Sequence, residues 1–91
     1  MSATEVIFVS EGDCPNCNRI RAVLNIIRHE YRHVDVNEVH PASQVGQTLA
    51  VEHRIGQLPA LIVNGRLRLI GQMSEHRIRA EVRHAGRPLF A

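Results

Sequence analysis

The feature that most constrains the fold of this chain is the segment Cys14-Pro15-Asn16-Cys17, which separates two apolar patterns of different period. Before it, the run from Val6 to Val9 is continuously apolar, which is typical of a strand covered on both faces. Pro15 suits the first turn of a helix, because a backbone N–H would have no partner there. The apolar side chains that follow recur at the spacing of one helix face: Ile20, Val23, Leu24, Ile27 and Tyr31. The sequence therefore predicts a strand, a tight turn carrying both cysteines of the chain, and an amphipathic helix.

The middle of the chain predicts one more strand and one more helix. Residues 32–37 alternate polar and apolar side chains, as in a half-exposed edge strand. A second helix is expected to begin at Pro41 and to run toward His53. Gly46 lies inside that segment and lowers its helix propensity. The apolar residues expected on this helix are Ala42, Val45 and Leu49.

The last third of the chain predicts a β-hairpin. The run from Ala60 to Val63 is continuously apolar and is expected to form a second covered strand. Asn64-Gly65 follows it, and both residues tolerate the positive φ angles of a type I′ turn. In the next segment Leu67 and Leu69 alternate with arginines, which is typical of an edge strand.

A third helix is predicted after Gly71, which ends the fourth strand. Ser74 is its expected N-cap, and Gly86 and Pro88 are expected to end it. Its buried stripe is expected to be Ile78 and Val82. The resulting order, βαβαββα, predicts an α/β fold with a four-stranded mixed sheet of order 2-1-3-4, flanked by three helices. Residues 1–91 are expected to form one domain.

At this point the chain resembles the thioredoxin superfamily in its smallest, glutaredoxin-like form. The resemblance rests on the CxxC after the first strand, Leu58-Pro59 before the third, and Gly71 after the fourth. It implies a thioredoxin-like fold, with Cys14 as the nucleophile and Cys17 as the resolving thiol. It also implies that Pro59 follows a cis peptide bond, packs beside the disulfide, and is preceded by a residue whose backbone binds substrate. The implied substrate-binding residues are Pro15, Asn16, Leu58, Pro59 and Gly71.

Several positions depart from the named branches of that superfamily. The Pro-Asn dipeptide between the cysteines is neither the Gly-Pro of thioredoxins nor the Pro-Tyr of typical glutaredoxins. Asp13 and Phe8 stand where thioredoxins have a tryptophan and a buried acid. Glutaredoxins usually hold glutathione with an upstream lysine and a Thr-Val-Pro segment, whereas this chain has Glu11-Gly12-Asp13 and Gln57-Leu58-Pro59. These differences argue against glutathione as a dedicated partner.

The expected reaction is thiol–disulfide exchange that reduces protein disulfides. The N-terminus of a helix lowers the pKa of Cys14, while the charges of Glu11 and Asp13 raise it. We therefore expect a pKa of about 6.5–8, which favours a reductant over a strongly oxidising disulfide donor. Arg19 and Arg21 follow in the helix, and the sequence does not fix where they point.

Alternatives to this chemistry remain open at this stage. The cysteines could be a structural pair without turnover, or the protein could be a glutathione-dependent glutaredoxin. It could also be a non-enzymatic carrier of a metal or an iron–sulfur cluster, although tetrahedral zinc needs four ligands and the chain has only two cysteines. The six histidines are scattered and are interpreted as surface residues rather than metal ligands: His29, His33, His40, His53, His76 and His84.

The expected partners follow from the reaction and from the composition. They are protein disulfide substrates and a reductant, either a flavoenzyme of the thioredoxin reductase type or a low-molecular-weight thiol, with no cofactor and no metal. The net charge of +2 is not clustered, so nucleic acid is not expected. Five arginines in the last third of the chain are interpreted as solvated faces: Arg66, Arg68, Arg77, Arg79 and Arg83. No segment is typical of a signal peptide or a membrane span, and a cytoplasmic monomer active in electron transport is expected.

Overall fold

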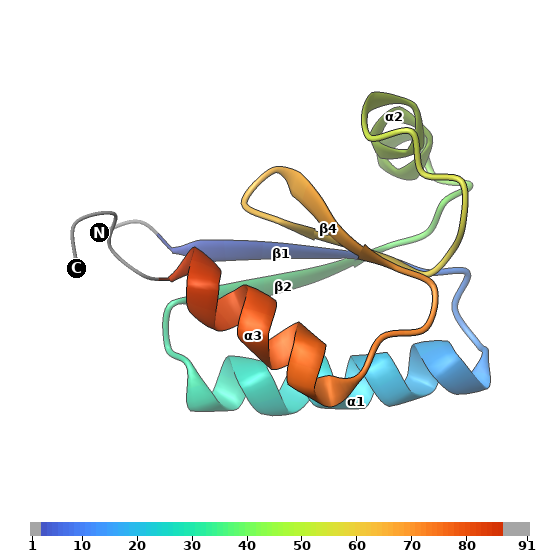
Figure 1. The fold of residues 1–91 in the computed structure, drawn as a ribbon. Coiled ribbons are helices and arrows are strands. Elements are labelled where there is room, and N and C mark those ends of the chain that lie inside the picture. The colour runs from blue at the N-terminus through green and yellow to red at the C-terminus, as the bar shows by residue number, and fades with distance from the viewer. Residues whose placement is uncertain (1–2, 87–91) are drawn as a thin grey trace.

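A computed structural model describes residues 3–86 of the chain, in which four strands and three helices follow in the predicted order βαβαββα (Figure 1). The elements are β1 (Thr4–Val9), α1 (Pro15–Glu30), β2 (Val34–Val39), α2 (Gln44–Glu52), β3 (Ala60–Val63), β4 (Arg66–Ile70) and α3 (Glu75–Ala85). The sheet has the order β2-β1-β3-β4. β1 and β2 are parallel, whereas the β1–β3 and β3–β4 pairs are antiparallel. The predicted element order and the mixed sheet are therefore confirmed.

The two faces of the sheet are covered differently. Helices α1 and α3 lie on one face, and α2 lies on the other face near one end of the sheet (Figure 1). The larger apolar cluster fills the space between the sheet and helices α1 and α3, and it includes the predicted stripes of both helices. Its fully buried members include Val6, Phe8, Ile20, Leu24, Ile27, Leu61 and Ile78. A smaller cluster beneath α2 is centred on Val9, Ala60 and Ile62.

Strand β4 departs from simple alternation. Leu69 pairs with Leu61, but Leu67 pairs with Ile62, so a register shift leaves Arg68 as an extra residue. In a regular strand two leucines two positions apart would share one face. The bulge instead places Leu69 in the cluster under α1 and α3 and Leu67 against the cluster under α2. Each face of the sheet thus receives one of the two leucines, which the sequence pattern alone did not predict.

The start of α2 was predicted wrongly. The helix begins at Gln44, not at Pro41, because Ser43 is its N-cap and its Oγ accepts a hydrogen bond from the Gly46 N–H at 3.0 Å. Gly46 is the buried residue of this helix, and a Cβ there would lie 2.1 Å from the His40 carbonyl oxygen. The glycine therefore permits close approach of the preceding turn, whereas Val45 is 59% exposed.

The remaining boundaries differ from the predictions by a few residues. β2 runs from Val34 to Val39 rather than over residues 32–37, in register with all of β1. Ser74 caps α3 through a hydrogen bond from the Arg77 N–H, and Gly86 is its C-cap, as predicted. Pro88 lies outside the described residues. Within residues 3–86 no helix is both long enough and apolar enough to cross a bilayer.

Two of the arginines interpreted as solvated are in fact ion-paired. Arg68 binds Glu81 at 2.7 Å and so joins β4 to α3. Arg79 binds Glu30 at 2.6 Å, which joins α3 to the end of α1, and also binds Glu75. The hydrogen bond from Arg79 lowers the pKa of Glu30. These pairs form because the strand and the two helices bring the opposite charges together on one face of the sheet.

Candidate active site

The site is built around the first turn of α1. Cys14 is the N-cap of this helix, with an extended backbone (φ −141°, ψ 151°), and Pro15 follows in the first turn. The Cys17 N–H donates a hydrogen bond to Cys14 Sγ at 3.0 Å. A thiolate at this position would accept the same bond and would face the positive end of the helix dipole. The helix start therefore stabilises the ionised form of Cys14.

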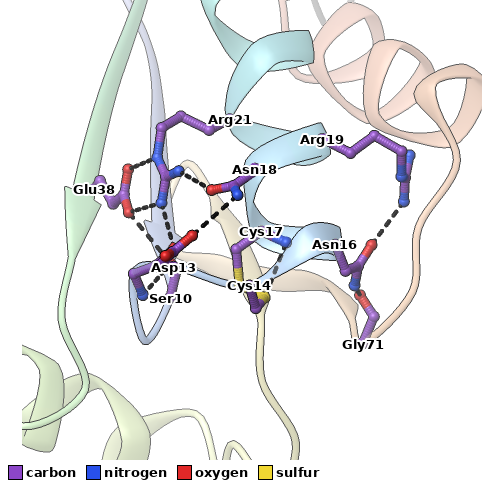
Figure 2. Close-up of a disulfide and its surroundings, with 11 residues drawn as sticks. Ser10, Asp13, Cys14, Asn16, Cys17, Asn18, Arg19, Arg21, Glu38 and Gly71 are labelled. Carbon is purple, nitrogen blue, oxygen red and sulfur yellow. Dashed lines mark hydrogen bonds and ion pairs between the residues drawn. A yellow bond between two sulfur atoms is a disulfide. The ribbon is translucent and has the colours of Figure 1, made fainter.

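The two cysteines form a disulfide, with their Cα atoms 5.0 Å apart. They differ in exposure, because Cys14 is only partly buried whereas Cys17 is 2% exposed and belongs to the larger apolar cluster. Figure 2 shows the sulfur atoms at the base of the helix. A substrate disulfide approaching from solvent would therefore meet Cys14 first.

One side of this turn is held by a charged network, which we call the strand-side flank: Ser10, Gly12, Arg21 and Glu38. Figure 2 shows Ser10, Arg21 and Glu38 together beside the turn. Arg21 binds Glu38 through two hydrogen bonds of 2.6 Å and donates a third to the Gly12 carbonyl at 2.8 Å. Because Glu38 accepts these bonds, its pKa is lowered and that of Arg21 is raised. The α1 helix and β2 thereby clamp the loop that precedes Cys14.

Ser10 completes this flank at the end of β1. Its side chain is 1% exposed; its hydroxyl donates to Glu38 at 3.2 Å and accepts from the Gly12 N–H at 2.9 Å. Gly12 has a φ of +106°, a conformation that favours glycine, and both its N–H and its carbonyl are hydrogen-bonded. The backbone N–H and the carbonyl of Gly12 are therefore both held, which fixes the turn that leads into the CxxC.

The acidic residue next to Cys14 is less free than the sequence suggested. Asp13 accepts a hydrogen bond from the Asn18 side chain at 3.2 Å, and its charge contributes to the raised pKa of Arg21. Arg21 therefore points back toward the loop and partly compensates the negative charge there.

The opposite side of the turn is held by neutral groups and one arginine, which we call the glycine-side flank: Asn16, Arg19, Gly71 and Met73. Asn16 donates from its side chain to the Gly71 carbonyl at 3.3 Å and accepts from Arg19 at 2.8 Å (Figure 2). Arg19 also donates to the Met73 carbonyl. The second residue between the cysteines thus anchors the loop between β4 and α3.

The proline segment reaches the same loop. The Leu58–Pro59 peptide bond is cis, and the Gly71 N–H donates to the Pro59 carbonyl at 2.7 Å. Gly71 is therefore bonded to Pro59 on one side and to Asn16 on the other. Three segments that lie far apart in the sequence, the CxxC, the proline segment and the loop after β4, are joined through this one glycine.

The family model of the thioredoxin domain matches residues 4–83. The chain belongs to the thioredoxin-domain family. No curated protein sequence matches it.

Solved structures agree with this family. An oxidised thioredoxin O2 from Arabidopsis thaliana is 16% identical with a TM-score of 0.73, over 91% of this chain and 75% of that one. A mutant thioredoxin from Halobacterium salinarum is 13% identical with a TM-score of 0.77, over 97% and 79%. An uncharacterised thioredoxin-like protein from Clostridium perfringens is 14% identical with a TM-score of 0.74, over 93% and 72%. At these identities the likeness establishes the fold, and the thioredoxin fold with the Cys14–Cys17 disulfide supports a redox function.

Sequence reasoning missed part of the site of this thioredoxin-domain chain. The sequence alone does not predict where Arg21 points, and neither Ser10 nor Glu38 is among the predicted site residues. A signal was available, because a parallel pairing of the first two strands brings the end of β2 beside the end of β1. A carboxylate near that end could then pair with an arginine on the helix that follows β1. Within residues 3–86 no group of three or more His, Cys, Asp or Glu side chains is placed to hold a metal ion.

Proposed function

We propose that the protein is a thiol–disulfide oxidoreductase that reduces disulfides in other proteins, with Cys14 as the nucleophile and Cys17 as the resolving thiol. The observation that carries the proposal is the asymmetry of the pair: Cys14 is partly exposed at the N-cap of α1 with the Cys17 N–H on its sulfur, whereas Cys17 is buried. Attack by the exposed sulfur followed by resolution from the buried one requires this asymmetry.

The reaction takes two exchange steps. The Cys14 thiolate attacks one sulfur of the substrate disulfide, and the other substrate sulfur leaves as a thiolate and takes up a proton. Cys17 then loses its proton and attacks Cys14, which releases the second substrate sulfur and leaves the Cys14–Cys17 disulfide. Two electrons pass to the substrate, and an external reductant must supply two electrons to regenerate the dithiol.

The groups around the disulfide are suited to a substrate polypeptide. Pro15 is exposed beside Cys14, and Leu58 is partly exposed before the cis proline. In this proposal the backbone of Leu58 binds an extended substrate segment, while Pro59 and Gly71 form the surface beneath it. Asn16 contributes by holding Gly71 in place. The proposal places the protein in the cytoplasm, where thiols are kept reduced.

The test is the reduction of insulin disulfides with the wild-type protein, Cys14→Ser and Cys17→Ser. Cys14→Ser is expected to abolish turnover, because Cys17 is sealed in the apolar cluster. Cys17→Ser is expected to accumulate a mixed disulfide with the substrate, seen as a mass increase that reductant reverses. Turnover by Cys14→Ser equal to that of the wild type would refute the proposal.

The source of electrons is tested in the same assay. We propose a flavoenzyme of the thioredoxin reductase type or a low-molecular-weight thiol as the reductant. Glutathione supplied alone is expected to regenerate the dithiol slowly, because no lysine stands before the CxxC. Efficient turnover with glutathione as the sole reductant would instead assign the protein to the glutaredoxins.

A further inference from the structure

A side chain outside the assigned residues lies against the centre of the glycine-side flank. A Cβ built on Gly71 would come within 2.8 Å of Gln57 Nε2 and 3.1 Å of Gln57 Cδ, and its three nearest atoms all belong to the Gln57 carboxamide. Gly71 is buried and has a φ of +71°. The carboxamide of Gln57 therefore rests on the face of Gly71 where any other residue would carry a side chain.

This position is next to the reacting groups. Gly71 donates to the Pro59 carbonyl and accepts from Asn16, whose neighbours in the chain are Pro15 and Cys17. Gln57 itself precedes the cis Leu58–Pro59 bond by one residue. The carboxamide thus lies where the CxxC, the proline segment and the loop after β4 meet.

The carboxamide is also free to bind. Gln57 is exposed, and its side chain makes no hydrogen bond to any other residue in the part of the chain that the structure describes. A glutamine amide carries two N–H donors and a carbonyl that accepts. Asn16, in contrast, uses both ends of its own carboxamide within the protein. Of these two amides beside Gly71, only that of Gln57 has its hydrogen-bonding capacity unused.

We propose that Gln57 is a substrate-binding residue that hydrogen-bonds the main chain of the polypeptide segment beside the cysteine under attack. This rests on the proposed function and names its substrate class. A carboxamide presents an N–H donor and a C=O acceptor on the same side, and so do the N–H and C=O of a single residue in an extended segment, so the two can pair regardless of the substrate's side chains. Being neutral, the amide offers no counter-charge to the carboxylates of a small thiol such as glutathione. The residue therefore favours polypeptide disulfides over small ones.

The test compares two disulfide substrates, one with a polypeptide main chain and one without. Insulin provides polypeptide disulfides, and 5,5′-dithiobis(2-nitrobenzoate) provides a disulfide without peptide groups. Gln57→Ala is expected to raise KM for insulin about three- to tenfold, the loss of about one hydrogen bond, with kcat unchanged. The rate with the aromatic disulfide is expected to stay within about twofold of the wild type. Gln57→Glu, which keeps the shape but loses the donors, is expected to raise KM for insulin as well.

Gln44→Ala serves as the matched control, because Gln44 is an exposed glutamine at the start of α2. If the wild type reduces insulin and Gln57→Ala leaves its KM unchanged, this inference is overturned while the proposed function stands. Equal slowing with both substrates would also overturn it, since Gln57 would then act on the thiols and not on the polypeptide. A wild type that reduces neither disulfide would remove the proposed function and this inference together.

Discussion

The two flanks of the CxxC turn are held by different chemistry. The strand-side flank is charged: Arg21 and Glu38 form a bidentate pair that also fixes the backbone of Gly12. The glycine-side flank is held by single hydrogen bonds to carbonyl groups, and the free carboxamide of Gln57 lies on its surface. One flank therefore fixes the loop that precedes Cys14, while the other carries the carboxamide that we propose binds a substrate.

The largest expected effect tests the backbone of the glycine-side flank. Gly71→Ala is expected to lower the free energy of unfolding by about 1–2 kcal/mol, because its φ of +71° is unfavourable for a residue with a Cβ. The new methyl group would also push the Gln57 side chain away. Urea denaturation of the oxidised protein measures the change. Gly56→Ala is the control, since a Cβ there meets nothing within 4 Å; equal losses in both variants would contradict the account.

The next effect tests the charged flank. Arg21→Gln is expected to lower the free energy of unfolding by about 1 kcal/mol, because Glu38 and the Gly12 carbonyl lose their donor and the pair is about one-third exposed. Arg28→Gln removes an arginine from the same helix that has no ion pair among residues 3–86, and it should change stability by less than about 0.5 kcal/mol. Chemical denaturation of both proteins decides the point. A loss in Arg28→Gln as large as that in Arg21→Gln would remove the special role of this pair.

The same pair predicts a pH dependence. Arg21 lowers the pKa of Glu38 below its ordinary value near 4.5, so the stabilisation is present above that value and is lost as the pH falls through the lowered pKa. Arg79 lowers the pKa of Glu30 in the same way, so the free energy of unfolding of both the wild type and Arg21→Gln should fall in acid. The difference in unfolding free energy between the wild type and Arg21→Gln isolates the contribution of the Arg21–Glu38 pair, because the Arg79–Glu30 pair is present in both. We expect this difference to shrink between pH 7 and about pH 3; a constant difference would be inconsistent with the ion pair.

The smallest effect concerns the hold of α1 on the loop after β4. Arg19→Gln removes the donor to the Met73 carbonyl and to Asn16. The Gly71 amide, which is bonded to Pro59, is expected to exchange with deuterium about threefold faster, with global stability nearly unchanged. Hydrogen exchange followed by NMR measures this, with Arg28→Gln as the reference. Unchanged protection at Gly71 would mean that Arg19 does not hold the loop.

Much of the fold was predictable because its signals are local. The continuous apolar runs predicted β1 and β3, and Asn64-Gly65 predicted the hairpin turn. In the structure Asn64 has a φ of +50° and Gly65 a φ of +79°. The stripes of α1 and α3 followed from helical spacing and were confirmed by burial. These features depend on residues close together in the chain, so a single sequence contains them.

The features that were missed depend on contacts between distant segments. The burial of Gly46 in α2 depends on its fit against the backbone at His40, which no helix propensity reveals. The bulge at Arg68 appears only when β4 is paired with β3. The Arg21–Glu38 pair requires the parallel register of β1 and β2. The sequence located the cysteines and the proline but not the network that positions them, because that network joins residues from three elements.

The most direct test of the central claim is the alkylation of the reduced protein by iodoacetamide across a pH series, with each cysteine followed by mass spectrometry. Cys14 is partly exposed at the N-cap of α1 and accepts the Cys17 N–H, whereas Cys17 is buried. We predict that Cys14 reacts first, with an apparent pKa of about 6.5–8, below the value of about 8.5 for a free thiol. Preferential alkylation of Cys17, or an apparent pKa of Cys14 at or above about 8.5, would contradict the account.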